Sequence, residues 1–357
     1  MSNSIGATPF DLSDWIDGDS RPGAVIGVLS RGVVQFWAAR GQSGLGSNET
    51  PLTPSTVFYI ASVSKQFTAA CVTLCELDGS LNVDAPIRAL LPELPDPFEQ
   101  VTIRHLLHHL GGLPQGWDLN KSEGQPWWDN LGLGDSISVL AKLERLPQPP
   151  GAGYSYSNAG YWLLAAGVER ATGVRFSDFA RQRLFAPLGM SNTRFRDDPD
   201  VPQPDLAMGH ATVDGSLVPY LTRFHCVGDG GLLTNLDDLA KWDLFWSGRS
   251  SLGGDLPTRL LERGRRDDGA SIYYARGVSV RTHRGLRIIS HGGSFIGYLA
   301  KLVRFPDQDF SIACLSNADD VDVDGLSMAV ADAVLGSAVD PDAPNWMQTL
   351  REDALDT

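Results

Sequence analysis

The sequence predicts an α/β protein of the α+β type, in which one antiparallel β-sheet is built from both ends of the chain and is flanked by helices. Two observations lead to this prediction. Short runs rich in β-branched and aromatic residues, separated by turn residues, lie near both ends of the 357-residue chain. The middle of the chain repeats apolar residues with the period of an α-helix, so a mainly helical region is expected to be inserted between the strands.

The first strands are expected at residues 23–30 and 33–39. Both runs are apolar and β-branched, and only Arg31 and Gly32 separate them. A two-residue connection that contains glycine is typical of a β-hairpin. The N-terminal part of the chain is therefore expected to supply two neighbouring antiparallel strands.

Four helices are expected in the middle of the chain, at residues 63–77, 161–171, 176–184 and 236–246. In the first of them, Phe67, Cys71 and Leu74 fall on one face, and Gly79 follows as a stop signal. This periodicity predicts a helix that packs one side against the core.

Residues 114–134 are rich in glycine, tryptophan and aspartate and are expected to form a long loop. Trp117, Trp127 and Trp128 in this loop are candidates for a lid over a pocket. The alternative is that these tryptophans pack the loop against the body of the protein.

Four more strands are expected near the C-terminal end, at residues 272–280, 286–290, 296–305 and 310–316. Turn residues such as Arg284-Gly285 divide them. We therefore expect a single unit over residues 1–357. Its sheet-containing part would comprise residues 1–75 and 245–335, its mainly helical part residues 76–244, and its acidic tail residues 338–357.

The composition argues against several partners and compartments. The chain carries 43 acidic and 29 basic side chains, a formal net charge of −14, so a nucleic acid or an anionic membrane surface would be repelled. No run is long and apolar enough to span a bilayer, and residues 1–20 show no secretory signal. Cys71, Cys75, Cys226 and Cys314 have no disulfide-like spacing and are expected to be reduced. A cytoplasmic location is expected, and the oligomeric state is left open.

The sharpest chemical signal is Ser62-Val63-Ser64-Lys65 at the start of the first predicted helix. If Ser62 begins the helix, Lys65 lies on the same face and its amine reaches the Ser62 hydroxyl. A serine hydroxyl is a weak nucleophile until a neighbouring base takes its proton, and burial can make a lysine such a base. A serine N-cap followed by a solvated lysine is the simpler interpretation of the bare tetrad. The catalytic interpretation therefore depends on the other motifs in the sequence.

The second signal is Tyr156-Ser157-Asn158, which follows the turn residues Pro149-Pro150-Gly151. Either Ser157 or Asn158 can cap the helix that follows. The functional interpretation places the Tyr156 phenol and the Asn158 amide in a catalytic cleft, where a phenol beside a lysine can exchange protons with the reacting groups.

The third signal is His291-Gly292-Gly293-Ser294, directly after the run at 286–290. Glycines after a strand allow another backbone or a ligand to approach closely. A lone histidine in such a place is usually structural. The paired glycines instead favour an edge strand that lines a cleft and pairs with an extended substrate.

These three motifs, in this order, resemble those of the serine β-lactamase and penicillin-binding-protein superfamily. The Tyr-Ser-Asn form is similar to that of class C β-lactamases, D-alanyl-D-alanine carboxypeptidases, D-aminopeptidases, D-amino-acid amidases and related esterases. The similarity runs over about residues 23–317 and includes the stretches at 101–114 and 228–242. The resemblance implies the fold of that superfamily, which agrees with the sheet and helical insert expected above.

The resemblance also implies roles for single residues. Ser62 would be the acylated nucleophile, Lys65 its activator and Tyr156 the general acid and base. Asn158 would contact the substrate carbonyl or Lys65. No cofactor is implied, and the partner is a small-molecule substrate.

In the third motif, the resemblance implies that His291 is a catalytic residue and that Gly293 belongs to the substrate-binding edge of the cleft. The backbone N–H groups of Ser62 and Ser294 would form an oxyanion hole, which stabilises the charge that develops during acyl transfer.

The third motif departs from that of efficient class C β-lactamases, which carry Lys-Thr-Gly where this chain has His291-Gly292-Gly293. The loss of the lysine and the threonine removes contacts to a substrate carboxylate. We expect a serine hydrolase that forms an acyl-enzyme on small amide or peptide substrates, including D-amino-acid derivatives, or on esters. The alternatives are a carboxylesterase, an acyltransferase of secondary metabolism and, in a different class, an inactive penicillin-binding-like sensor.

Two other clusters are interpreted as structural, so no metal is expected. His105, His108 and His109 have a spacing that zinc can use, but no carboxylate motif accompanies them. Residues 320–325 match the first half of a calcium loop, but Ala331 stands where the closing glutamate belongs.

Overall fold

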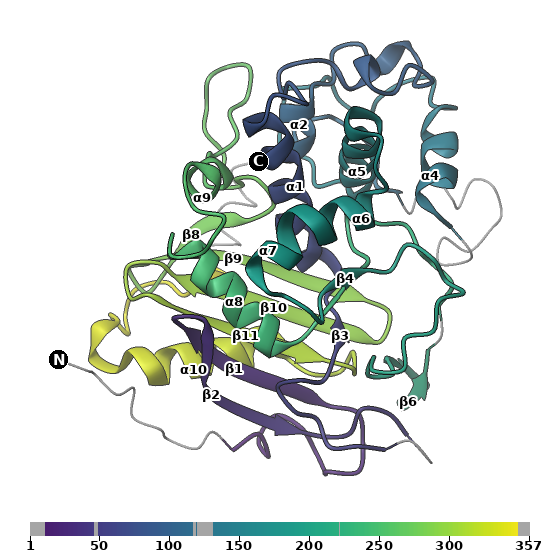
Figure 1. The fold of residues 1–357 in the computed structure, drawn as a ribbon. Coiled ribbons are helices and arrows are strands. Elements are labelled where there is room, and N and C mark those ends of the chain that lie inside the picture. The colour runs from purple at the N-terminus through teal and green to yellow at the C-terminus, as the bar shows by residue number, and fades with distance from the viewer. Residues whose placement is uncertain (1–10, 46–48, 117–118, 120–130, 221, 349–357) are drawn as a thin grey trace.

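The computed structural model describes residues 11–45, 49–116, 119, 131–220 and 222–348, which contain a six-stranded antiparallel sheet (Figure 1). The strand order is β2-β1-β11-β10-β9-β8. The strands are β1 (Ala24–Ser30), β2 (Val33–Arg40), β8 (Ser279–His283), β9 (Leu286–Phe295), β10 (Tyr298–Phe305) and β11 (Phe310–Ser316). Since β1 pairs with β11, the two ends of the chain meet in the middle of this sheet. The predicted antiparallel sheet built from both ends is confirmed.

The N-terminal hairpin forms because its turn matches the twist of the strands. Arg31 and Gly32 have φ angles of 56° and 81°, the left-handed values of a type I′ turn, and such turns match the right-handed twist of paired strands. The strand β1 is buried along its whole length, whereas Val33 and Trp37 of the edge strand β2 are exposed. The hairpin predicted from the two runs is confirmed.

Helices cover both faces of the sheet (Figure 1). Along β11, Ala313 and Leu315 belong to the core on the side of the α8 helix, and Ile312 and Cys314 belong to the core on the side of α10. This alternation follows from the period of two along a strand. The helices are α1 (Lys65–Leu77), α2 (Ile103–Leu107), α4 (Leu133–Leu140), α5 (Asn158–Thr172), α6 (Phe176–Ala180), α7 (Ala186–Leu188), α8 (Leu236–Trp246), α9 (Leu256–Leu260) and α10 (Val323–Leu335).

Shorter elements connect these helices to the sheet. The single turns are η1 (Ala61–Ser64), η2 (Ile87–Ala89), η3 (Asp96–Phe98), η4 (Arg181–Phe185) and η5 (Gly336–Ala338). A small sheet joins β3 (Phe58–Tyr59), β7 (Leu232–Thr234) and β4 (Arg194–Phe195), and β5 (His210–Val213) pairs with β6 (Ser216–Pro219). The small sheet fixes the segment just before η1, because β3 ends two residues before that turn begins.

Three predicted elements differ most from those in the structure. The prediction of a strand at 272–280 is wrong for most of these residues, because β8 begins only at Ser279. In that segment the Arg276 side chain is fully buried, and Gly277 has a φ angle of 75°. The helix expected at 176–184 is interrupted after Ala180 by the π-helical turn η4. The strand expected at 286–290 continues to Phe295 as β9 and so contains the whole third motif.

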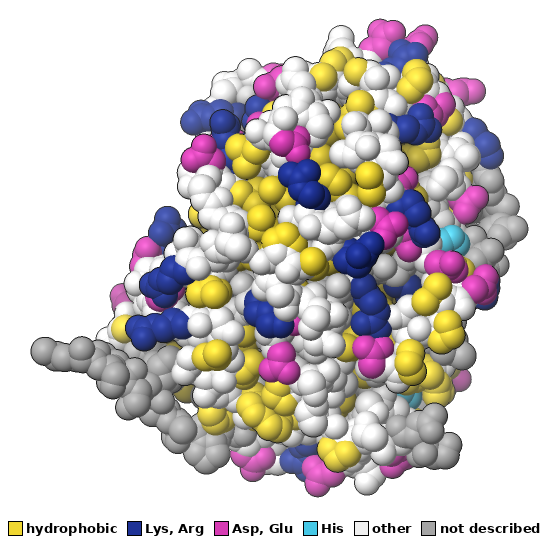
Figure 2. All heavy atoms as spheres, in the orientation of Figure 1, with side chains coloured by type: hydrophobic (Ala, Val, Ile, Leu, Met, Phe, Trp, Pro, Cys, Tyr) yellow, Lys and Arg dark blue, Asp and Glu magenta, His cyan; other side chains and the backbone are white. Residues whose placement is uncertain are grey.

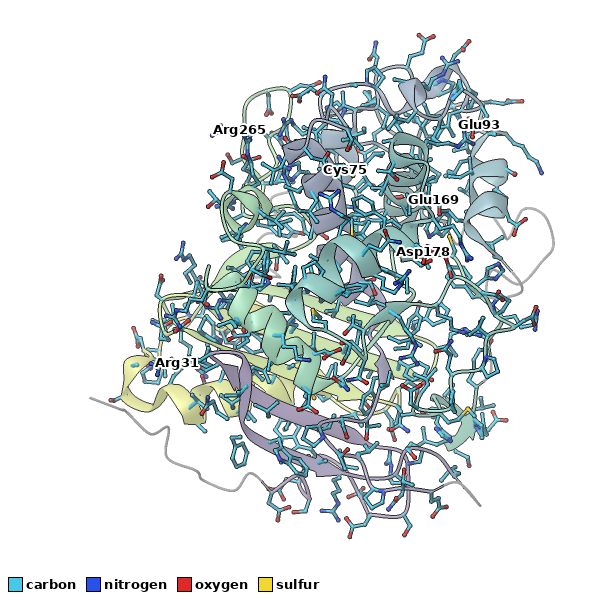
Figure 3. The ribbon with its side chains drawn as sticks, viewed as in Figure 1. Arg31, Cys75, Glu93, Glu169, Asp178 and Arg265 are labelled. Atoms are coloured by element: carbon cyan, nitrogen blue, oxygen red, sulfur yellow. The ribbon has the colours of Figure 1, made fainter. Side chains whose placement is uncertain are left out.

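Acidic and basic side chains are interspersed over the face of the molecule shown in Figure 2. Many are paired, such as Arg104 with Asp84, where two hydrogen bonds of 2.6 and 3.0 Å join the guanidinium and the carboxylate. Cys75 lies on α1 (Figure 3), and it is buried and unpaired like the three other cysteines. Among the described residues, no helix combines the length and the apolar character needed to cross a membrane.

Candidate active site

Ser62 lies in η1, the turn directly before α1, and is partly exposed. Ala61 before it has a φ angle of 46°, a left-handed value that is uncommon for any residue other than glycine. Ser62 is thus partly exposed while Lys65, the first residue of α1, is completely buried. The Lys65 Nζ and Ser62 Oγ atoms are 3.0 Å apart. The structure thus brings the predicted nucleophile and its activator into contact.

The Lys65 amine has two further polar neighbours. It donates to Asn158 Oδ1 at 2.7 Å and to the backbone carbonyl of Asp229 at 2.8 Å. Burial lowers the pKa of Lys65 to about 7, and the negative charge of Asp229 opposes this shift. Of the two contacts expected for Asn158, the one to Lys65 is present.

This arrangement satisfies the amine in both charge states, because an ammonium can donate to all three oxygens and a neutral amine can keep its lone pair for Ser62. A neutral amine has two N–H bonds and one lone pair, and the two oxygens of Asn158 and Asp229 accept the two N–H groups. The lone pair is then directed towards the Ser62 hydroxyl at 3.0 Å. A base in that position can take the serine proton as the oxygen attacks a carbonyl.

The Tyr156 ring lies close to the same amine. The Lys65 Nζ atom is 4.8 Å from the centre of the Tyr156 ring. Burial raises the pKa of Tyr156, and a hydrogen bond with Ser62 partly offsets the effect. The phenol is therefore protonated at neutral pH, whereas burial lowers the pKa of Lys65 to about 7. These pKa directions favour Lys65 over a Tyr156 phenolate as the base in the free protein.

His109 holds the segment that carries Tyr156. Its Nδ1 atom accepts from the backbone N–H of Ser157 at 3.1 Å, and its carbonyl accepts from the N–H of Ser155 at 2.8 Å. The His109 ring also lies against the Tyr156 ring, with 4.3 Å between their centres. His109 was expected to be structural, and in the structure its contacts also hold Tyr156 in position. Ser157 occupies the N-cap position of α5, but its hydroxyl donates to Pro114 O instead of capping the helix.

His291 lies on β9, with both ring nitrogens engaged. The Nδ1 atom is 2.6 Å from the carbonyl oxygen of Gly292, and the Nε2 atom is 3.0 Å from the Tyr274 hydroxyl. A neutral ring satisfies both contacts when Nδ1–H donates to Gly292 and Nε2 accepts from Tyr274. Burial, reinforced by the charge of Lys65, lowers the pKa of His291 to about 3. His291 is therefore uncharged at neutral pH, unlike a lysine in its place.

Gly293 marks the closest approach between β9 and the nucleophile turn. A Cβ atom at Gly293 would lie 2.3 Å from Ile60 O and 3.1 Å from Ser62 N. The strand β8 pairs with β9 only as far as Ser290, so within the described chain the edge of β9 beyond that residue faces η1 and has no strand beside it. Ser294 is exposed at this edge, and its role as an oxyanion donor stays a prediction.

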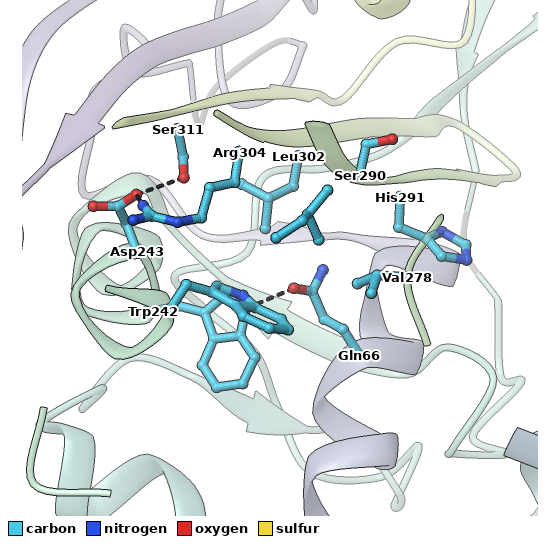
Figure 4. A pocket seen from close by; sticks show the side chains of 11 residues that line it. Gln66, Trp242, Asp243, Val278, Ser290, His291, Leu302, Arg304 and Ser311 are labelled. Carbon is cyan, nitrogen blue, oxygen red and sulfur yellow. Dashed lines mark hydrogen bonds and ion pairs between the residues drawn. The ribbon is translucent and has the colours of Figure 1, made fainter. Parts of the chain in front are cut away.

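The helix α8 and His291 line the same small cavity from different sides (Figure 4). The cavity is also lined by α1 and other residues of the sheet. Trp242 of α8 donates its indole N–H to Gln66 Oε1 at 2.6 Å, next to Lys65, and Ser311 of β11 donates to Asp243 at 2.5 Å. These bonds tie the helix that carries Lys65 to the sheet that carries His291.

The family model described as Beta-lactamase matches residues 12–336. The chain belongs to the beta-lactamase family. That membership agrees with the fold and with the three motifs that meet at Ser62.

Individual relatives in the beta-lactamase family have the following similarities. Penicillin-binding protein 4* of Bacillus subtilis (strain 168) is 30% identical over 341 residues, covering 87% of this chain and 72% of that protein. A D-aminopeptidase of Gluconobacter oxydans (strain 621H) is 28% identical over 298 residues, covering 83% of this chain but only 56% of that protein. The solved structure of an octameric penicillin-binding protein homologue from Pyrococcus abyssi has a TM-score of 0.78 at 25% identity and covers 88% of this chain and 74% of that one.

Sequence reasoning missed two residues of this beta-lactamase-family site. Asp229 contacts Lys65, and Tyr274 contacts His291. Asp229 lies in a glycine-rich stretch that was noted only as part of the resemblance, and Tyr274 lies in a segment assigned to a strand. Within the described ranges, no cluster of histidine, cysteine and acidic residues is arranged to hold a metal ion. The candidate lid residues Trp117, Trp127 and Trp128 lie outside the described residues.

Proposed function

We propose that this chain is a serine hydrolase that forms an acyl-enzyme at Ser62. The observation that carries the proposal is the 3.0 Å contact between a partly exposed hydroxyl and a completely buried amine. Burial lowers the pKa of Lys65 to about 7, and a base is most effective when its pKa lies near the working pH. The intact set of Ser62, Lys65, Tyr156 and His291 argues against an inactive sensor.

The reaction follows from the contacts. Ser62 Oγ attacks the substrate carbonyl carbon while its proton moves to the Lys65 amine. We assign the negative charge that develops on the carbonyl oxygen to the backbone N–H groups of Ser62 and Ser294. The protonated Lys65 and the Tyr156 phenol then return a proton to the leaving group as its bond to the carbonyl carbon breaks. Water releases the acyl group in the reverse sequence of proton transfers.

The substrate class that we propose is an amide or peptide whose leaving group carries no carboxylate, with D-amino-acid derivatives as the first choice. The support is the third motif, because a neutral His291 with both nitrogens engaged cannot attract a carboxylate as a lysine would. The D-aminopeptidase relative agrees with this choice. A carboxylesterase and an acyltransferase use the same acyl-enzyme and stay as alternatives.

The mechanism is tested by intact-protein mass spectrometry after incubation with a fluorophosphonate and, separately, with a penicillin. We expect a single adduct in the wild type and none in Ser62→Ala. An adduct that persists in Ser62→Ala, or no adduct in the wild type with either reagent, would contradict the proposal. Labelling by the penicillin as well would favour the peptidase over the esterase.

The substrate class is tested by comparing D-alanine amide with D-alanyl-D-alanine and with a short p-nitrophenyl ester. We expect kcat/KM for the amide to exceed that for the carboxylate-bearing dipeptide by at least about tenfold, or about 1.4 kcal/mol. A preference for the dipeptide would overturn the assignment of His291. A preference for the ester by orders of magnitude would favour the carboxylesterase, and product formation that depends on an added amine or alcohol would favour the acyltransferase.

We also propose that the protein works in the cytoplasm. The support is the set of four cysteines, which are buried and unpaired, as in proteins of reducing compartments. Cell fractionation with an antibody against the native protein tests this location, and recovery outside the cytoplasmic fraction would contradict it.

A further inference from the structure

Asp229 contacts the catalytic amine through its backbone carbonyl, and the charge of its buried side chain also acts on that amine. The carbonyl oxygen of Asp229 accepts from Lys65 Nζ at 2.8 Å, although the two residues are 164 positions apart in the chain. Asp229 as a whole is only 4% exposed. A carboxylate that is buried without a nearby positive charge is strongly unfavourable, so the amine of Lys65 and this carboxylate stabilise one another.

The loop that carries Asp229 is locked against α1 and α5. Thr68 of α1 donates its hydroxyl to the carbonyl of Gly228 at 2.7 Å, and the N–H of Gly231 donates to the Tyr59 hydroxyl at 2.9 Å. A Cβ atom at Gly228 would lie 2.3 Å from the carbonyl oxygen of Tyr161. The glycine therefore lets the loop come closer to α5 than another residue would allow. This packing holds the backbone of Asp229, and with it the carbonyl that contacts Lys65, in place.

The charges around this pair come from several elements. Burial raises the pKa of Asp229, and the Lys65 charge and hydrogen bonding from Trp162 lower it. The Asp229 charge in turn raises the pKa of Lys65 and adds to the raised pKa values of Tyr59, Tyr156 and Cys226. Lys65 also helps to lower the pKa values of His109 and His291, which are therefore neutral neighbours.

We propose that Asp229 is a positioning residue whose buried carboxylate is the counter-charge that makes Lys65 a strong enough base to take the Ser62 proton. This inference rests on the proposed role of Lys65 in acylation and adds the group that controls its charge. Without the carboxylate, only the unfavourable burial would act on Lys65, and the amine would hold a proton less tightly. Its base strength towards Ser62 would fall with it.

The direct test is an NMR titration of the lysine Cε carbons in the full chain labelled with ¹³C-lysine. The chain contains few lysines, Lys65, Lys121, Lys142, Lys241 and Lys301, and the loss of one signal in Lys65→Arg assigns the catalytic one. We expect Lys65 to titrate near pH 7 in the wild type. In Asp229→Asn we expect the midpoint to fall by about one unit or more, a tenfold change in the proton equilibrium. The pH at half-maximal fluorophosphonate labelling should fall by the same amount.

Asp238→Asn is the matched control. Asp238 of α8 is also completely buried and accepts hydrogen bonds of 2.8 Å from Asn192 N and Thr193 Oγ1, but it makes no contact with Lys65. A purely structural loss should appear as a lower melting temperature in either variant without a shift of the Lys65 midpoint. Asp229→Ser is a second neutral variant for the case that the asparagine does not fold.

The two proposals fail in different ways. A midpoint in the neutral Asp229 variants within about 0.3 unit of the wild type, or an equal shift in Asp238→Asn, would overturn the role of Asp229 even if Ser62 is labelled. Absence of labelling in the wild type would overturn the proposed function, and the NMR titration would still decide whether Asp229 controls the charge of Lys65.

Discussion

The close approach at Gly293 gives the sharpest prediction for the site. In Gly293→Ala the new methyl group would lie 2.3 Å from the carbonyl oxygen of Ile60. That carbonyl accepts a hydrogen bond from Val63 at 3.1 Å, and the N–H of Ile60 donates to Leu232 at 3.1 Å. Because the acceptor belongs to a bonded backbone and not to a flexible side chain, either β9 or the nucleophile turn has to move.

The size of the effect follows from the size of that movement. A carbon–oxygen contact needs about 3.2 Å or more, so the two segments must separate by about 1 Å. A displacement of about 1 Å between reacting groups lowers the rate by about 100-fold. The same overpacking destabilises the folded state by about 1–3 kcal/mol. We therefore expect Gly293→Ala to reduce the rate of Ser62 acylation about 100-fold in a protein that still folds.

The neighbouring glycine is the control. A Cβ atom at Gly292 would meet only Ala300 O and Lys301 Cδ, at 3.9 and 4.0 Å, which are ordinary contacts. Gly292→Ala should therefore acylate within a few-fold of the wild type and change the free energy of unfolding by less than about 0.5 kcal/mol. Stopped-flow acylation and urea unfolding measure both quantities. Equal losses in the two variants, or full activity in Gly293→Ala, would refute the reasoning from the close approach.

Three further predictions concern charge. The kcat/KM for acylation should fall about tenfold per pH unit below pH 7 and stay level up to about pH 9, because Lys65 acts as a neutral base and its pKa is lowered to about 7; a profile that is level down to pH 5 would exclude this base. Because the pKa of Lys65 is lower in the folded protein than its ordinary 10.5, the unfolded chain binds more protons between those values. The free energy of unfolding should therefore rise by about 1.4 kcal/mol per pH unit in that window relative to Lys65→Met. Urea unfolding at several pH values measures it, and the same pH dependence in both proteins would contradict the prediction. Arg276→Met should destabilise the fold by about 3–5 kcal/mol, since the fully buried guanidinium pairs with two carboxylates; Arg249→Met, in an exposed pair with Asp309, should cost under about 1 kcal/mol in the same assay.

Local patterns were enough to predict most of the fold. The strand at 310–316 and the helix at 236–246 have the predicted boundaries, because a buried strand and an amphipathic helix carry their signal in every residue. The end of β9 could not be predicted in this way. Its last residues include Gly292 and Gly293, which have low strand propensity, and they are extended because β10 pairs with them.

The candidate site was predictable where its residues are close in sequence or belong to a recognisable motif. Ser62 and Lys65 are three residues apart, so helix geometry alone predicts their contact. The left-handed conformation of Ala61 has no such signal, because it results from the packing of β3, η1 and β9. The Tyr274 contact with His291 was missed because the segment was expected to be a strand, in which side chains alternate between faces.

The base strength of Lys65 shows why a Ser-x-x-Lys tetrad alone does not identify an enzyme. On an isolated helix the same lysine would be solvated and would hold its proton up to about pH 10. In this chain Asn158 and Asp229, from segments far away in the sequence, enclose the amine, and burial brings its pKa to about 7. The proposed nucleophile therefore depends on three separate parts of the chain meeting at one amine. A variant that keeps the tetrad but loosens the loop of Asp229 would keep the motif and lose the chemistry.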